Sequence, residues 1–301
     1  MSRPDVVVVG GGPGGLTAAA LLAESSVSVA VVDQLGGGGQ LLNLGRFVDD
    51  FGVLGPGTGP ELGAALIDRA GAAGAEVGYG QATSLELRDG EVVVGTDFGP
   101  RTADRVVIAT GTRPRPLGID GGARLEGRGV CYCAACDGPM YAGRPVAVLG
   151  GGEAVAYEAI ELAEFASGVI VIADGAARIP PRLGAKLAAD ERIEVLTGWS
   201  AESLHGATAV ESLTVAGDGQ TRELAIAGLF VCNGVLPNTE WCADVLPLDA
   251  TGRIDVDLSL RAGDTVYAIG DVRSGAGTSV VAALADAAAV TRRLVAELAT
   301  T

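Results

Sequence analysis

The chain has 301 residues, of which 48% are hydrophobic and 19% are charged, and its formal net charge is −16. This hydrophobic content excludes a wholly disordered chain, and the acidic balance disfavours binding to the phosphate backbone of nucleic acids. No stretch approaches the roughly 18 apolar residues of a membrane span, so we expect a cytoplasmic protein with no membrane partner.

Residues 5–33, DVVVVGGGPGGLTAAALLAESSVSVAVVD, predict an apolar strand, a glycine turn, a helix and a second apolar strand. The turn fits G-x-G-x-x-G, and an acidic residue ends the second strand. Such a turn lets a dinucleotide pyrophosphate approach the backbone at a helix N-terminus, while the carboxylate can accept hydrogen bonds from a ribose. The candidate binding residues here are Gly10, Gly12, Pro13, Gly14, Gly15 and Asp33.

Three cysteines fall within residues 131–136, and the last two belong to the sequence CAACD. The C-x-x-C spacing brings two sulfurs to disulfide distance within one turn, and a carboxyl group nearby can move a proton. Zinc is the main competing use, but it needs four ligands, and the chain has no second C-x-x-C and one histidine. We therefore predict a redox pair, Cys133 and Cys136, with Asp137 behind it and no metal. A buried structural disulfide is the remaining alternative.

A second strand–turn–helix–strand unit spans residues 145–174 and also ends in an aspartate. Two such units predict an α/β protein with two doubly wound Rossmann-like nucleotide-binding domains. Proline and glycine signals after the later strands indicate that the second domain is inserted in the first. We expect a first domain of residues 1–114 and 245–301 and a central domain of residues 115–244 that carries the cysteine pair.

Several motifs follow one another in a recognisable order: GGGPGG, GGGQL, VIATGTRPRPLGI, RGVCYCAACDGPMYAGRPVAVLGGG, LFVCNGVLPNTEW and VYAIGDV. Over nearly its whole length the chain thus resembles the low-molecular-weight thioredoxin reductases and their flavoprotein relatives. The resemblance implies FAD in the first domain, a homodimer, and a thioredoxin-like protein or a small dithiol or disulfide as the partner.

The resemblance also implies roles for individual residues. The pyrophosphate of FAD would lie on residues 10–15 and its adenosine ribose on Asp33. Cys136 would be the sulfur nearest the flavin, Cys133 would attack the external disulfide, and Asp137 would manage the proton. The other implied FAD contacts are Gln40, Leu41, Asp50 (where the family usually has asparagine), Ala82, Ala109, Thr110, Gly111, Gly270, Asp271 and Ser279, from which the last helix would point at the flavin ring.

The sequence departs from the family pattern at the second glycine turn. Glu153 places a negative charge beside the helix end that should receive a pyrophosphate, and Val155 stands where a small residue is expected. The next strand is followed by Asp174, and only Arg178 is basic there, in place of the family's arginines for the 2′-phosphate of NADPH. Because an aspartate repels phosphate, we expect that NADPH is not the donor. Residues 277–278, Gly-Thr, also replace the family's Arg-Gln pair near the flavin.

Three hypotheses follow from this pattern. The leading one is an FAD disulfide oxidoreductase that takes electrons from ferredoxin, another flavoprotein or NADH and passes them through the cysteine pair. The second is an oxygen-linked dithiol oxidase that forms disulfides in a small metabolite. The third is a non-enzymatic flavin redox sensor, against which the intact C-x-x-C argues.

Overall fold

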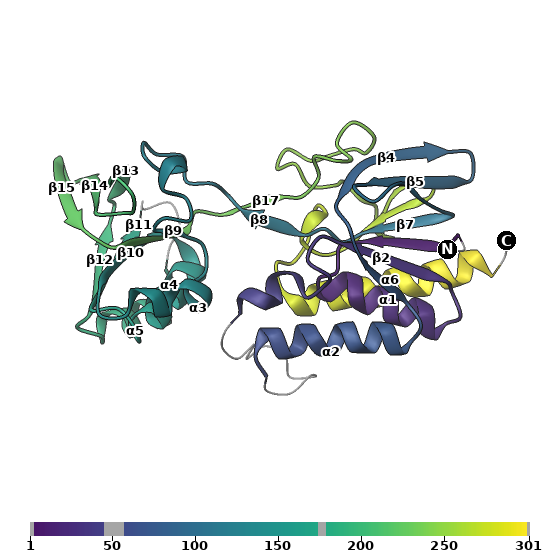
Figure 1. Cartoon of the computed structure of the whole chain (residues 1–301), viewed down its shortest axis with the longest axis horizontal. Coiled ribbons are helices and arrows are strands. Elements are labelled where there is room, and N and C mark those ends of the chain that lie inside the picture. The colour runs from purple at the N-terminus through teal and green to yellow at the C-terminus, as the bar shows by residue number, and fades with distance from the viewer. Residues whose placement is uncertain (1–2, 45–56, 174–178, 300–301) are drawn as a thin grey trace. The chain divides into compact units, whose positions relative to one another are not determined.

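The computed structural model describes residues 3–44, 57–173 and 179–299. The chain forms two compact units (Figure 1). Unit 1 comprises residues 1–113 and 236–301, and unit 2 comprises residues 114–235. Strands β8 (Thr112–Pro114) and β17 (Val235–Pro237) pair with each other where the chain passes from one unit to the other.

Unit 1 is built on a six-stranded sheet in the order β18-β19-β7-β1-β2-β3. Every neighbouring pair is parallel except β18 with β19. All four residues of the central strand are buried, as a continuous apolar run requires when both faces of a sheet are covered. The strands are β1 (Val6–Val9), β2 (Val29–Asp33), β3 (Glu76–Tyr79), β7 (Arg105–Ile108), β18 (Arg261–Gly263) and β19 (Val266–Ala268).

Helices cover one face of this sheet, and a small antiparallel sheet covers the other. Val6 and Val8 point into a core that they share with Leu16 of the first helix, whereas Val7 and Val9 pack against the small sheet. The helices are α1 (Pro13–Glu24), α2 (Gly59–Ala72) and α6 (Val280–Leu298), and the small sheet consists of β4 (Ala82–Arg88), β5 (Glu91–Thr96) and β6 (Arg101–Ala103). The short helices η1 (Gly39–Asn43) and η4 (Gly270–Val272) follow β2 and β19.

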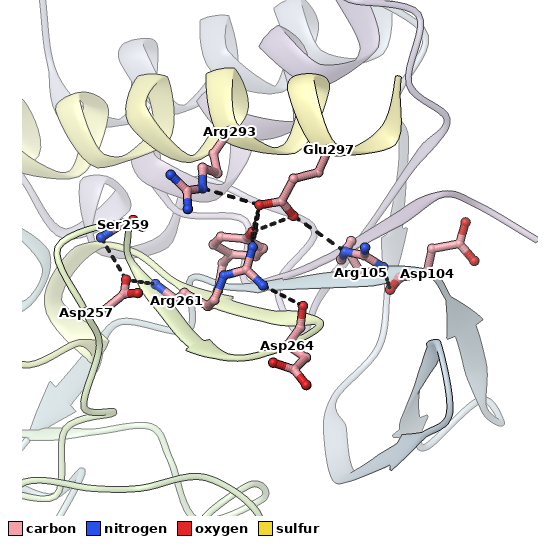
Figure 2. A network of polar contacts seen from close by, with 9 residues as sticks. Asp104, Arg105, Asp257, Ser259, Arg261, Asp264, Arg293 and Glu297 are labelled. Atoms are coloured by element: carbon pink, nitrogen blue, oxygen red, sulfur yellow. Dashed lines mark hydrogen bonds and ion pairs between the residues drawn. The ribbon is translucent and has the colours of Figure 1, made fainter. Parts of the chain in front are cut away.

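A polar network fixes the C-terminal end of α6 to the sheet (Figure 2). The Glu297 carboxylate accepts hydrogen bonds from Arg261, from Arg293 at 3.3 Å and from the Tyr267 hydroxyl at 2.8 Å, and it forms an ion pair with Arg105 at 3.8 Å. Burial opposes ionisation of this carboxyl, but Tyr267 and Arg261 outweigh it and lower the pKa of Glu297. The network therefore stabilises the packing of α6 on unit 1.

Unit 2 is built on a five-stranded, entirely parallel sheet in the order β12-β11-β10-β16-β9. One face packs against helices and the other against an antiparallel meander. The strands are β9 (Val130–Cys131), β10 (Pro145–Gly150), β11 (Gly168–Ala173), β12 (Ile193–Thr197) and β16 (Gly228–Cys232). The helices are α3 (Ala134–Asp137), α4 (Gly152–Leu162) and α5 (Pro181–Ala188), with the short η2 (Ala123–Leu125) and η3 (Gly138–Tyr141). The meander is β13 (Ser200–His205), β14 (Ser212–Gly217) and β15 (Gln220–Ala225).

The fold class expected from the sequence, α/β with two Rossmann-like domains, is confirmed. The chain returns to unit 1 at residue 236, whereas the sequence suggests residue 245. The difference has a packing reason: Cys242 is 1% exposed and lies in the same core as Val7 and Ile254 of unit 1. None of the helices in the described ranges is both long enough and apolar enough to cross a membrane.

Candidate active site

The first glycine turn links β1 to α1 with very close backbone contacts. Gly10 has a φ of +106°, and a Cβ built there would lie 2.3 Å from the Ala109 carbonyl oxygen. A Cβ on Gly15 would lie 1.9 Å from the Gly10 carbonyl oxygen. Only glycine satisfies both positions, and the result is a tight turn with the helix pressed against it.

The N-terminus of α1 presents backbone N–H groups beside Gly12. Gly12 is the N-cap and supplies no side chain to bond these groups, and Pro13 follows it at the first helical position. A Cβ built on Gly12 would meet no heavy atom within 4 Å, although Gly39 lies close behind it. This uncapped helix end with room in front of a glycine fits a pyrophosphate, because the N–H groups and the helix dipole both favour an anion.

Asp33, at the end of β2, organises the loop beside this turn. Its carboxylate accepts hydrogen bonds from the backbone N–H of Gly11 at 2.7 Å, of Leu35 at 2.8 Å and of Gly37 at 3.0 Å. Since two carboxylate oxygens offer about four acceptor positions, capacity remains for a ribose hydroxyl. Asp33 therefore joins the glycine turn to the loop of residues 35–39 through hydrogen bonds within the protein.

The strand β7 ends at a turn to which two other segments bond. Thr110 donates from its hydroxyl to the Asn238 carbonyl at 2.9 Å, and the Asn238 amide donates back to the Thr110 carbonyl at 2.8 Å. Asn238 also donates its backbone N–H to the Gly111 carbonyl at 3.0 Å. The Gln40 amide donates to the Thr112 carbonyl at 2.8 Å. These bonds bring Gln40 and residues 109–111 to the carboxyl end of the sheet.

The segment after β19 carries an ion pair that the sequence did not reveal. Asp286 of α6, 8% exposed, accepts a hydrogen bond from the Gly270 N–H at 2.9 Å. Arg273 donates to both oxygens of the same carboxylate, at 2.7 and 2.8 Å. The Arg273–Asp286 pair thus fixes the loop of residues 270–273 against α6. In the same loop, burial raises the pKa of Asp271, as does the nearby Asp286, whereas Arg253 lowers it.

The remaining candidates of unit 1 are Ser279, Leu41, Ala82, Asp50 and Gly14. Ser279 is the N-cap of α6 and accepts a hydrogen bond from the Ala282 N–H at 3.1 Å. Leu41 is 1% exposed and belongs to the core, and Ala82 begins β4. Asp50 lies outside the described residues. Gly14 completes the arrangement, since a Cβ there would lie 3.4 Å from Ala283 of α6.

In unit 2, Cys133 and Cys136 form a disulfide whose Cα atoms are 5.4 Å apart. Cys133 is the N-cap of α3, and its sulfur accepts a hydrogen bond from the Cys136 N–H at 3.1 Å. Cys133 is 8% exposed, whereas Cys136 is exposed. The predicted cysteines are therefore brought together, in a short helical turn at the edge of a packed core.

Asp137 closes α3 and lies among other titratable groups. It interacts with the Cys131 thiol, which also contacts the Tyr141 hydroxyl at 3.3 Å. Burial raises the pKa of Cys131 to about 11, with Asp137 adding to the effect. Cys131 is thus a protonated packing thiol at neutral pH, and Asp137 is the carboxyl nearest in sequence to the disulfide.

The second glycine turn differs from the first. Glu153 stands in the first turn of α4, and its carboxylate accepts a hydrogen bond from Arg182 of α5 at 2.6 Å. Val155 is fully buried in the unit 2 core, so its branched side chain is accommodated by packing. Asp174 and Arg178, from which the sequence argues against binding of the 2′-phosphate of NADPH, lie outside the described residues. The N-terminal end of α4 therefore carries an acidic side chain.

Comparison with known proteins identifies the chain. The model of the pyridine nucleotide-disulphide oxidoreductase family matches residues 4–287. The chain belongs to this family. The thioredoxin reductase of Treponema pallidum is 31% identical over 288 residues, 94% of each chain. The crystal structure of Lactococcus lactis thioredoxin reductase superimposes with a TM-score of 0.93 at 27% identity over 98% of this chain and 100% of that one. T. acidophilum thioredoxin reductase gives a TM-score of 0.91 at 27% identity over 99% of both.

These similarities confirm the expected class of protein. It is a thioredoxin reductase-like flavoprotein that uses FAD and acts on a disulfide. The open, uncapped start of α1 and the glycine turn fit the pyrophosphate of such a cofactor. Bound FAD supplies two-electron transfer, and the chain supplies the disulfide at residues 133 and 136 and the carboxyl groups around it.

Sequence reasoning missed four side chains that hold these sites: Asn238, Arg273, Asp286 and Glu158. Asn238 lies within the quoted motif LFVCNGVLPNTEW, but Thr239 and Glu240 beside it are polar too, so its polarity did not single it out. Asp286, by contrast, was visible as the one acidic residue in an otherwise apolar stretch of α6. Glu158 occupies a helix that reads as ordinary amphipathic sequence, and only the fold brings it to the cysteine pair.

Proposed function

We propose that this protein moves electron pairs between FAD and the Cys133–Cys136 pair, which exchanges them with a thioredoxin-like protein or a small disulfide. The observation that carries the proposal is the disulfide between Cys133, the N-cap of α3, and Cys136 within α3, followed directly by Asp137. Cys136 is the flavin-side sulfur and Cys133 attacks the external disulfide. Because Cys133 is buried in the disulfide form, its attack requires the sulfur to become accessible after the S–S bond opens.

Trapping tests these two roles. After Cys136→Ser, the remaining Cys133 should form a stable mixed disulfide with a thioredoxin-like protein that itself lacks its resolving cysteine. Cys133→Ser should trap little partner, because Cys136 serves the flavin side. Equal trapping by both variants, or trapping by Cys133→Ser alone, would contradict the assignment.

The proposed FAD site gathers the candidates at the carboxyl ends of the unit 1 strands. Close backbone contacts link Gly10 to Gly15 and to residues 109–110, and Asp33 bonds the glycine turn. In the proposal Gly12 and α1 receive the pyrophosphate, Asp33 the adenosine ribose, and Gly270 and Asp271 the ribityl end. The sequence-predicted contacts Gln40, Leu41, Asp50, Ala82 and Ser279 complete the proposed site.

The donor in this proposal is ferredoxin, another flavoprotein or NADH. The support is Glu153 in the first turn of α4, whose carboxylate is bonded by Arg182 of α5 and stands where a dinucleotide phosphate would need an anion-binding end. Asp174 in the sequence adds a second negative charge near the expected 2′-phosphate. Anaerobic mixing of the yellow holoenzyme with each donor tests this. Rapid, saturable flavin bleaching by NADPH at micromolar concentration would overturn it.

We also propose a homodimer in the cytoplasm. Cys131, Cys232 and Cys242 are not disulfide-bonded, as expected where thiols stay reduced. Light scattering of the holoenzyme at micromolar concentration should give about twice the 30.0 kDa chain mass. A monomer mass under these conditions would refute the dimer without touching the redox proposal.

A further inference from the structure

A carboxyl group of α4 bonds directly to the loop that carries the disulfide. Glu158 accepts a hydrogen bond at its Oε2 from the backbone N–H of Ala134, at 2.6 Å. Ala134 is the first residue after Cys133. The N–H groups of Cys136 and Asp137 bond within the turn, to the Cys133 sulfur and to the Cys133 carbonyl, each at 3.1 Å. The Ala134 N–H instead bonds to Glu158, outside the turn.

The surroundings of Glu158 are acidic or neutral in the described part of the chain. Asp137 faces it from α3 and Glu161 from the next turn of α4, while Cys232 lies at the end of β16. Burial above all, and then Glu161 and Asp137, raise the pKa of Glu158 to about 7, against the opposing Ala134 hydrogen bond. Burial and the nearby Glu158 raise the pKa of Cys232 to about 12, so that thiol stays neutral. No described cation is among the groups that shift Glu158.

We propose that Glu158 is a positioning residue of the Cys133–Cys136 pair, which holds the loop in the disulfide form and takes up a proton when the disulfide is reduced. The inference rests on the proposed redox role of the two cysteines. In the reduction, two electrons from the reduced flavin break the S–S bond. One sulfur takes the proton that the reduced flavin gives up with the electron pair and becomes a thiol, and the other keeps its electron pair as a thiolate. A second proton, from solvent, converts the Glu158 carboxylate to the acid.

Electrostatics gives the reason for this second proton. Cys133 directly precedes Ala134, so a thiolate on Cys133 adds a negative charge near the Glu158 carboxylate. That carboxylate already lies near Asp137 and Glu161. Like charges at such range favour the protonated form of one of them. Glu158 starts with its pKa close to neutrality, so it can change state at physiological pH. Its protonation also weakens its acceptor oxygen and hence the hydrogen bond from the Ala134 N–H.

The test compares wild type with Glu158→Gln as FAD-loaded enzymes in dithiothreitol redox buffers from about pH 6 to about pH 9. The amide oxygen of glutamine can still accept from Ala134, but it cannot titrate. Alkylation and mass measurement give the reduced fraction of the pair, and dithiothreitol affects both proteins alike. We expect equal reduction near pH 6 and a ratio that rises to about tenfold in favour of the variant by pH 9. The variant is easier to reduce at pH 9 because Glu158 of wild type is ionised there and repels the thiolate, whereas glutamine carries no charge.

Other outcomes separate the possible failures. A ratio that stays constant across the pH range, whatever its size, overturns the inference and leaves Glu158 a structural anchor. Wild-type cysteines that dithiothreitol reduces without any bleaching of the flavin refute the proposed function itself. Glu161→Gln is the matched control on the same helix, because it removes a neighbouring charge but not the Ala134 bond. The ratio of reduction in Glu158→Gln to reduction in Glu161→Gln should rise with pH as it does against wild type, but the rise should begin at lower pH.

A second measurement covers the case in which Glu158→Gln does not fold. The reduced-minus-oxidised infrared spectrum of wild type near pH 7.5 should gain the band of a protonated carboxylic acid. Asp137→Asn should retain that band at lower pH, because the Asp137 charge raises the pKa of Glu158. Absence of the band in wild type, or its loss at every pH in Asp137→Asn, overturns the inference.

Discussion

Arg182 of α5 donates a hydrogen bond, at 2.6 Å, to the carboxylate of Glu153 in the first turn of α4. Both side chains are more than half exposed, so the pair adds little to stability. Its importance lies in its position, because it puts a paired acid where a dinucleotide phosphate would need free N–H groups and positive charge.

Glu153→Gln should therefore strengthen binding of NADH and NADPH. The change removes a negative charge from the helix end and frees Arg182 for a phosphate, which should lower the dissociation constant about five- to tenfold. Isothermal titration of the holoenzyme measures the change. Glu191→Gln, an exposed acid elsewhere in unit 2, is the charge-matched control and should have no effect. Equal affinities in all three proteins would show that Glu153 does not govern this site.

Gly15→Ala should abolish FAD retention. A Cβ at this position would lie 1.9 Å from the Gly10 carbonyl oxygen, so α1 must move away from the turn that receives the pyrophosphate. The ratio of flavin absorbance to protein absorbance after purification measures retention. Gly71→Ala in α2 is the control, since a Cβ there meets nothing within 4 Å, and it should retain FAD with stability raised by about 0.5–1 kcal/mol. A yellow Gly15→Ala protein would contradict the proposed turn.

Asp286→Ala should destabilise unit 1 and weaken FAD binding. It leaves Arg273 without its bidentate partner and the Gly270 N–H without an acceptor, at a cost of about 3–5 kcal/mol for breaking a buried ion pair. Urea unfolding and FAD release measure the two effects. Asp286→Asn, which keeps one acceptor oxygen, should fall between wild type and alanine. An alanine variant as stable as wild type would show that the pair contributes nothing.

Glu297→Gln tests the network of Figure 2 through its pH dependence. The pKa of Glu297 is lowered in the folded protein, so its contribution is present above the unfolded pKa and is lost as pH falls through the folded value. At pH 7 the variant should be less stable by about 1–3 kcal/mol, and the difference should shrink below about pH 4. Urea unfolding at both pH values measures it. A difference that does not change with pH would contradict the electrostatic origin.

Local patterns predicted much of the fold. The apolar runs around the two glycine turns gave the parallel strands and their helices, and the alanine-rich segment of residues 280–298 is the helix expected from it. Contacts between distant segments could not be read in this way. The bonds of Asn238 to Thr110, Asp286 to Gly270 and Glu158 to Ala134 span 128, 16 and 24 residues. They depend on which strand ends meet, and so only the fold reveals them.

Reduction of the flavin by a dithiol through the cysteine pair is the most direct measurement. Oxidised holoenzyme is mixed anaerobically with dithiothreitol, and the flavin absorbance is followed in wild type and in a Cys133→Ser, Cys136→Ser double variant. Electron exchange between the pair and FAD predicts bleaching in wild type and an oxidised flavin in the double variant over the same time. Bleaching at the same rate in both proteins, or in neither, would contradict it.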